Sequence, residues 1–129
     1  MVIESIGSLR SYVVLPTLHR FIPPLLLMAL IFALSAQPDL NSGLGVWDTL
    51  LRKLAHMAEY GLLWWLWRRA LGSTAAAAAI TLAFAVTDEW HQTFVTGRHG
   101  TPVDWAIDAV GVLIAIALHA RYNQPRSVA

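Results

Sequence analysis

Residues 50–67, LLRKLAHMAEYGLLWWLW, combine a long apolar run with polar side chains at regular spacing. The polar residues recur every three or four positions as Lys53, His56, Glu59 and Tyr60. Side chains at these intervals share one face of an α-helix, so His56 and Glu59 are close enough to interact. A carboxylate inside an apolar segment costs about 3 kcal/mol or more in lipid unless it faces protein or water. This stretch therefore predicts a membrane-embedded helix with a polar inner face.

The composition of the whole chain is that of an integral membrane protein. Of its 129 residues, 57% are hydrophobic and 13% are charged, and the mean hydropathy is +0.55. An ordinary soluble domain has about 25% charged residues. The net charge of +1 is too small to indicate nucleic acid as a partner. The chain has no cysteine and therefore no disulfide framework.

Four apolar segments are close to the minimum length, about 17 to 20 residues, for crossing a hydrocarbon core about 30 Å thick. We expect transmembrane helices near residues 21–36, 50–67, 73–90 and 102–119. The last has the clearest start, because Thr101 supplies a hydroxyl cap, Pro102 suits a first turn and Asp104 follows three residues after the cap. The predicted fold class is therefore all-α, a polytopic membrane protein with a bundle of about four transmembrane helices. Residues 1–129 are expected to form a single membrane domain.

Basic residues predict the orientation, because cytoplasmic loops carry an excess of lysine and arginine. Six of the nine lie beside the termini or in the middle loop, namely Arg10, Arg20, Arg68, Arg69, Arg121 and Arg126. The opposite loops contain Arg52, Lys53 and Arg98. We therefore expect a multi-pass protein of the plasma (inner) membrane with both termini in the cytoplasm. The alternative for the first segment is a secretory signal, because residues 33–35, Ala-Leu-Ser, resemble a cleavage site.

Segments that alternate across the membrane bring most of the polar side chains to its outer side. The candidate ligand-binding residues are Lys53, His56, Glu59, Tyr60, Asp88, Glu89, His91, Gln92, Arg98, Asp104 and Asp108. Two glycines, Gly97 and Gly100, flank Arg98 and free the loop to lean over the cluster. One pocket is expected to collect His56, Glu59, Asp88, His91, Arg98 and Asp108.

Each of these groups also has a structural interpretation. His56 and Glu59 can form a buried hydrogen-bonded pair that joins helices. Asp104 can be only a helix-start residue, and Arg98 can simply neutralise nearby carboxylates.

Other polar and small residues receive structural predictions. The interfacial anchors are expected to be Trp64, Trp65, Trp67, Trp90 and Trp105. Gly111 and Ala115 have the spacing of a small-residue packing face between helices. His99 and His119 are expected to be exposed and are assigned no role.

Three fragments in order carry a family resemblance, and they are preceded by Ser35-x-Gln37-Pro38. The fragments are Lys53-x-x-His56-x-x-Glu59-Tyr60-x-x-Leu63, Thr87-Asp88-Glu89-x-His91-Gln92-x-Phe94-Val95-x-Gly97-Arg98 and Asp104-x-x-x-Asp108-x-x-Gly111. Their order and spacing resemble the VanZ-like family of small membrane proteins. The chain departs from the family pattern at Thr96, where proline is usual, and at Asp108, where asparagine is frequent.

The resemblance implies a membrane domain of about four to five helices. One branch of the family is associated with low-level resistance to the glycopeptide teicoplanin, and the family has no settled biochemical activity. A shared fold does not assign that resistance to this chain.

Two classes of function are compatible with these residues, beside a purely structural role. The first is binding of a lipid-linked cell-envelope intermediate, with Arg98 and Lys53 contacting phosphate and carboxylates contacting sugar hydroxyls. The alternative is a small intramembrane hydrolase or transferase acting on a lipid head group, with a histidine as base and a carboxylate to orient it. The expected partners are the lipid bilayer and such an envelope intermediate, and the sequence leaves the oligomeric state open.

A metal-dependent enzyme is part of the second class. Its ligands would come from His56, Glu59, Asp88, His91 and Asp108. A nitrogen and oxygen set of this kind suits zinc or manganese.

Overall fold

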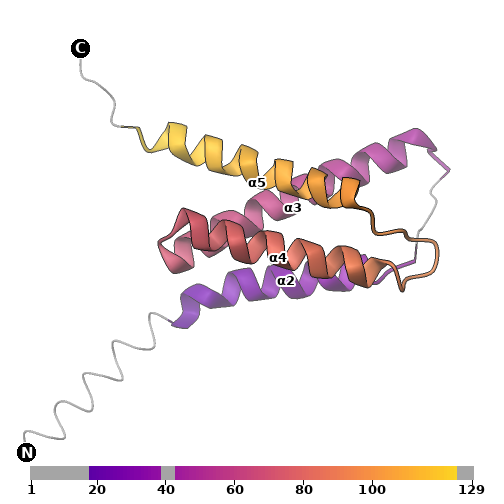
Figure 1. Cartoon of the computed structure of the whole chain (residues 1–129), viewed down its shortest axis with the longest axis horizontal. Coiled ribbons are helices and arrows are strands. Elements are labelled where there is room, and N and C mark those ends of the chain that lie inside the picture. The colour runs from indigo at the N-terminus through magenta and orange to yellow at the C-terminus, as the bar shows by residue number, and fades with distance from the viewer. Residues whose placement is uncertain (1–17, 39–42, 125–129) are drawn as a thin grey trace, which may run out of the picture.

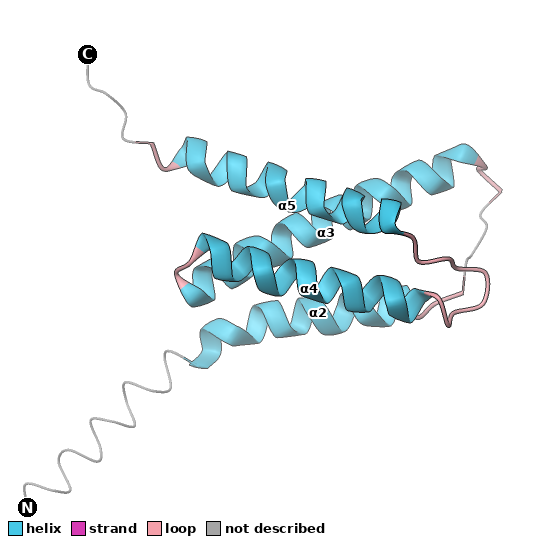
Figure 2. Cartoon of the chain, in the orientation of Figure 1, coloured by secondary structure: helices cyan, strands magenta, loops and turns pink. Residues whose placement is uncertain are grey.

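The computed structural model describes residues 18–38 and 43–124, and this part of the chain is helical, with no β-strand (Figure 2). A short 3-10 helix, η1 (His19–Phe21), leads into α2 (Ile22–Ser35), which is followed by α3 (Val46–Leu71), α4 (Thr74–Gln92) and α5 (Pro102–Tyr122). The predicted all-α class with four long helices is confirmed for these residues. The largest difference from the expected bounds is in α3, whose 26 residues continue through charged positions on both sides of the apolar run.

Helix ends follow local signals in the sequence. The helix α5 begins at Pro102, as predicted, because the Thr101 hydroxyl oxygen accepts the backbone N–H of Asp104 at 3.2 Å. At the start of α4, the Ser73 side chain accepts the N–H of Ala76 at 3.2 Å. Gly72 ends α3 with φ +72°, a left-handed conformation that favours glycine.

The four helices run back and forth, so that α2 and α4 end on the side where α3 and α5 begin (Figure 1). The most extensive helix pairing is between α3 and α5, followed by that between α3 and α4. This arrangement brings the first turns of α3 and α5 and the last turns of α4 to the same end of the bundle.

A close approach between α3 and α5 depends on small residues. A Cβ atom on Gly111 would collide with the backbone oxygen of Met57, and a Cβ on Gly61 would lie 3.0 Å from the carbonyl oxygen of Gly111 and 3.5 Å from the Cβ of Ala115. The prediction that Gly111 and Ala115 form a packing face is therefore confirmed.

The buried core is built mainly from apolar side chains of α3, α4 and α5, with Ile31 from α2. It includes two of the expected interfacial tryptophans, because Trp64 is 0% and Trp67 is 8% exposed. The indole N–H of Trp64 donates to the carbonyl oxygen of Thr74 at 3.3 Å, which satisfies its polar atom inside the protein. The prediction that Trp64 and Trp67 are surface anchors is therefore wrong, whereas Trp90 is 66% exposed.

The outer surface carries many large apolar side chains, especially on α2 and α5. Within the described residues, α5 is the one helix long and apolar enough to cross a membrane, judged by length and composition, and residues His19–Ser35 form a shorter apolar helix. The multi-pass arrangement expected from the sequence therefore stays a prediction.

Candidate functional site

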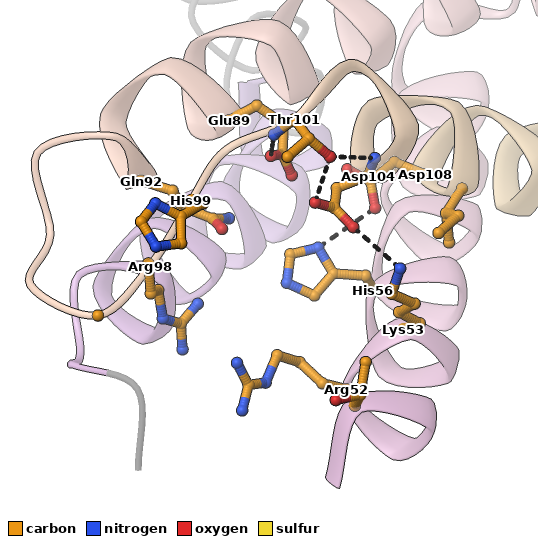
Figure 3. A pocket seen from close by; sticks show the side chains of 13 residues that line it. Arg52, Lys53, His56, Glu89, Gln92, Arg98, His99, Thr101, Asp104 and Asp108 are labelled. Atoms are coloured by element: carbon orange, nitrogen blue, oxygen red, sulfur yellow. Dashed lines mark hydrogen bonds and ion pairs between the residues drawn. The ribbon is translucent and has the colours of Figure 1, made fainter. Parts of the chain in front are cut away.

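A cavity of about 340 Å³ opens at the end of the bundle where α4 ends and α3 and α5 begin. Figure 3 shows its side chains converging from these three helices and from the loop before α5. The sequence-predicted candidates that line it are Lys53, His56, Glu89, Gln92, Arg98, Asp104 and Asp108. Polar residues that the sequence analysis did not include as candidates also line it, namely Thr49, Arg52, His99 and Thr101.

One wall of the cavity is formed by a histidine and two carboxylates from three different helices. The Nδ1 atom of His56 on α3 lies 3.2 Å from Oδ1 of Asp108 on α5. Glu89 on α4 completes the group, and ligand-type atoms of these three residues all lie within 4.8 Å of one another. We call His56, Glu89 and Asp108 the acidic triad.

The two carboxylates of the acidic triad are buried, and in each of them only one oxygen has a polar partner among the described residues. Asp108 is 0% exposed and Glu89 is 7% exposed. Oε2 of Glu89 accepts the backbone N–H of Thr101 at 3.2 Å. Oε1 of Glu89 and Oδ2 of Asp108 have no hydrogen-bond partner within the described part of the chain. Buried carboxylate oxygens of this kind are costly unless a proton or a cation sits between them.

A third carboxylate of the cavity, Asp104, is better paired. Asp104 accepts the Thr101 hydroxyl at 2.6 Å, and its other oxygen lies 3.3 Å from Nζ of Lys53. Both members of this ion pair are partly exposed, so it contributes little to stability. Asp104 is therefore a residue of the first turn of α5, where its carboxylate accepts the hydroxyl of the capping Thr101, and it also lines the cavity.

The opposite side of the cavity is basic. In the view of Figure 3, Arg98, with His99 beside it, and Arg52 lie on the side of the cavity away from Glu89, and all three line it. The Nε atom of Arg98 is buried and has no hydrogen-bond partner among the residues that the structure describes. The cavity therefore places an arginine donor opposite a carboxylate-rich wall.

Four other predicted residues lie outside this cavity, and two of them belong to a separate buried cluster. Asp88 is 0% exposed, and its Oδ2 accepts hydrogen bonds from Ser35 at 2.8 Å, Tyr60 at 3.2 Å and Gln92 at 3.2 Å. These bonds join α2, α3 and α4. Asp88 and Tyr60 thus connect helices inside the bundle, while Oδ1 of Asp88 is buried without a hydrogen-bond partner among the described residues.

His91 and Glu59 also lie outside the cavity lining. The ring of His91 stacks on Phe32 of α2, with ring centroids 4.0 Å apart and an interplanar angle of 25°. Glu59 is half-buried on α3 and does not line the cavity. Of the six residues expected in one pocket, His56, Arg98 and Asp108 line this cavity, whereas Glu59, Asp88 and His91 do not.

The set of residues expected to bind a metal also differs from the set that the structure brings together. The described histidines and carboxylates that come close enough to hold one ion are the acidic triad, with Glu89 in place of Glu59, Asp88 and His91.

Of the residues that were not candidates, Arg52 precedes His56 by four residues, so helical spacing could have placed it on the cavity face. Ser35 was part of a quoted motif, but nothing in its local sequence indicated a partner 53 residues away.

The fold and the site define a class: a small all-helical protein with an apolar exterior and a charged cavity between the ends of three helices. The sequence model of the VanZ/LLP1 family matches residues 6–122, nearly the whole chain. The chain therefore belongs to the VanZ/LLP1 family. Comparison with curated proteins and comparison with solved structures give no significant match.

Proposed function

We propose that this protein is a multi-pass protein of the plasma membrane whose cavity binds the phosphorylated head group of a lipid-linked cell-envelope component. Exposed leucine, isoleucine and valine side chains on α2 and α5 support the membrane assignment, because apolar surface of this extent is rare on soluble monomers. Family membership and the distribution of basic residues agree with it. With both termini in the cytoplasm, the cavity would open at the outer leaflet.

The observation that carries the binding proposal is Arg98 at the mouth of the cavity. Its buried Nε atom has no partner among the described residues, and a guanidinium group binds phosphate oxygens through paired, charge-assisted hydrogen bonds. Lys53 lies on the same cavity but already contacts Asp104 at 3.3 Å. The carboxylates on the opposite wall are suited to accept hydrogen bonds from sugar hydroxyls. Charges of both signs fit a head group that contains phosphate and sugar.

The binding proposal is tested with a pair of prenyl lipids that differ only in the phosphate. Full-length protein in detergent should bind farnesyl phosphate more tightly than farnesol, and rising salt should weaken the difference. Arg98→Gln should weaken farnesyl phosphate binding by about 10- to 100-fold, because a charged hydrogen bond contributes about 1.5–3 kcal/mol. Arg121→Gln, an exposed arginine at the far end of α5, is the matched control and should bind like the original protein. Equal binding of the two lipids would refute the proposal.

A second candidate function is a metal-dependent hydrolase or transferase that acts on the same head group. The acidic triad favours it, because three protein ligands beside an open cavity leave room for water or substrate on a metal. Release of inorganic phosphate from farnesyl phosphate by the purified protein would favour catalysis. Stable binding without turnover, in the presence of zinc or manganese, would favour the binding function.

A further inference from the structure

We infer that His56, Glu89 and Asp108 form a binding site for one divalent transition-metal ion. The three residues come from α3, α4 and α5, and each supplies a ligand atom within 4.8 Å of the other two. Metal bonds to histidine nitrogen and carboxylate oxygen are about 2.0–2.2 Å long, so two atoms bound to one ion lie at most about 4.4 Å apart. A side-chain shift of about 1 Å would bring all three atoms within reach of one ion.

The buried oxygen atoms give an independent reason for a cation. Oε1 of Glu89 and Oδ2 of Asp108 are buried and unpaired within the described chain, and their residues are 7% and 0% exposed. In a low-dielectric interior two facing carboxylates repel each other, and a cation between them removes both the repulsion and the unsatisfied acceptors.

The surroundings of the acidic triad resemble an outer coordination shell. The Thr101 N–H holds Oε2 of Glu89 at 3.2 Å and thereby fixes the direction of the other oxygen. The Thr101 hydroxyl also donates to Asp104, which pairs with Lys53 at 3.3 Å. Thr101 therefore links one ligand, Glu89, to the first turn of α5 from outside the site.

The donor set indicates which ions fit. One imidazole nitrogen and two carboxylate groups, without sulfur, suit zinc or manganese better than copper(I), and three protein ligands leave positions open toward the cavity. A phosphate oxygen can occupy such a position while Arg98 contacts the same phosphate. This last step rests on the proposed function, whereas the metal site itself rests only on the acidic triad.

Metal titration of the purified full-length protein tests the inference. After treatment with a chelator and its removal, the protein should bind about one Mn²⁺ or Zn²⁺ per chain, followed by calorimetry for both ions and by electron paramagnetic resonance for Mn²⁺. Glu89→Gln and Asp108→Asn should each weaken the affinity by about tenfold or more, because each removes an anionic ligand. Arg121→Gln, an exposed substitution at the far end of α5, is the control and should leave the affinity unchanged.

Several outcomes decide between the alternatives. Failure of the original protein to bind either ion would overturn the metal site, as would binding that neither Glu89→Gln nor Asp108→Asn weakens. If a variant does not fold, the metal stoichiometry of the original protein and the rise of its unfolding temperature with Mn²⁺ still decide the question. Farnesyl phosphate binding by a protein that takes up neither Mn²⁺ nor Zn²⁺ in the titration would leave the proposed function standing and refute this inference. Metal binding without phosphate-dependent lipid binding would support this inference and refute the proposed function.

Discussion

His56 and Asp108 meet across the interface of α3 and α5, with Nδ1 and Oδ1 3.2 Å apart although 52 residues separate them in the chain. Asp108 is fully buried, and both residues line the cavity. One polar contact thus joins the two most extensively packed helices and forms the wall of the site. A structural role and a functional role of this pair predict different effects when either residue is substituted.

Substitutions of Asp108 should separate these roles. Asp108→Asn keeps a hydrogen-bonding group beside His56 and removes a buried charge, so the unfolding temperature in detergent should be unchanged or higher. Asp108→Ala leaves a partly buried imidazole without its partner and should lower stability by about 1–3 kcal/mol. Thermal unfolding of both variants gives the comparison, and an alanine variant as stable as the original would show that the contact contributes nothing to folding.

The cluster around Asp88 should behave as a purely structural element. Asp88→Ala removes the acceptor of three hydrogen bonds from Ser35, Tyr60 and Gln92 and should destabilise the bundle by about 2–4 kcal/mol. Tyr60→Phe loses one of these bonds and should cost about 1 kcal/mol. The neighbouring exposed Thr87→Ala is the control and should stay within about 0.5 kcal/mol. Metal affinity should be unaltered in folded Tyr60→Phe, and a large loss would mean that the two clusters are coupled.

The contact of α3 with α5 predicts an unusual effect of adding one methyl group. Alanine normally stabilises a helix relative to glycine by about 1 kcal/mol. At Gly111, however, the new Cβ would collide with the backbone oxygen of Met57, so Gly111→Ala should destabilise the protein by about 1–3 kcal/mol. Equal or greater thermal stability of this variant would show that the two helices do not need to approach so closely.

The loop before α5 is expected to control the acidic triad through Gly100. A Cβ at this position would collide with the backbone carbonyl of Glu89, and the shift would pull the Thr101 N–H away from the Glu89 carboxylate. Gly100→Ala should therefore weaken Mn²⁺ binding by about tenfold while the helices stay folded, as judged by circular dichroism. Thr96→Ala, an exposed change in the same loop, should have no effect on metal affinity.

Membrane topology can be measured with reporter fusions. Because basic residues are concentrated beside the termini and the middle loop, fusions after Arg69 and after Arg121 should report the cytoplasm. A fusion at Gly43 should report the outside of the membrane. A cytoplasmic signal at Gly43 would place the cavity on the inner side and contradict an outer-leaflet ligand.

Much of the fold could be predicted because its signals are local. The start of α5 at Pro102 follows from the Thr101 cap and the proline that suits a first turn. The small-residue face of Gly111 and Ala115 is likewise visible in the spacing of the residues. The tryptophans were predicted less well, because a rule for interfacial residues does not distinguish Trp64, whose indole N–H finds a partner inside the bundle, from exposed Trp90.

The sequence by itself determined the helices, the concentration of polar residues at their ends and the family resemblance. Only the tertiary structure decided which carboxylate belongs to which cluster. Asp88 and Glu89 are adjacent, yet consecutive residues point about 100° apart around a helix axis. Asp88 therefore faces Ser35 and Tyr60, whereas Glu89 faces His56 and Asp108. The rotation of α4 between its neighbours sets this division, and that rotation follows from the packing of all the helices together rather than from any local segment.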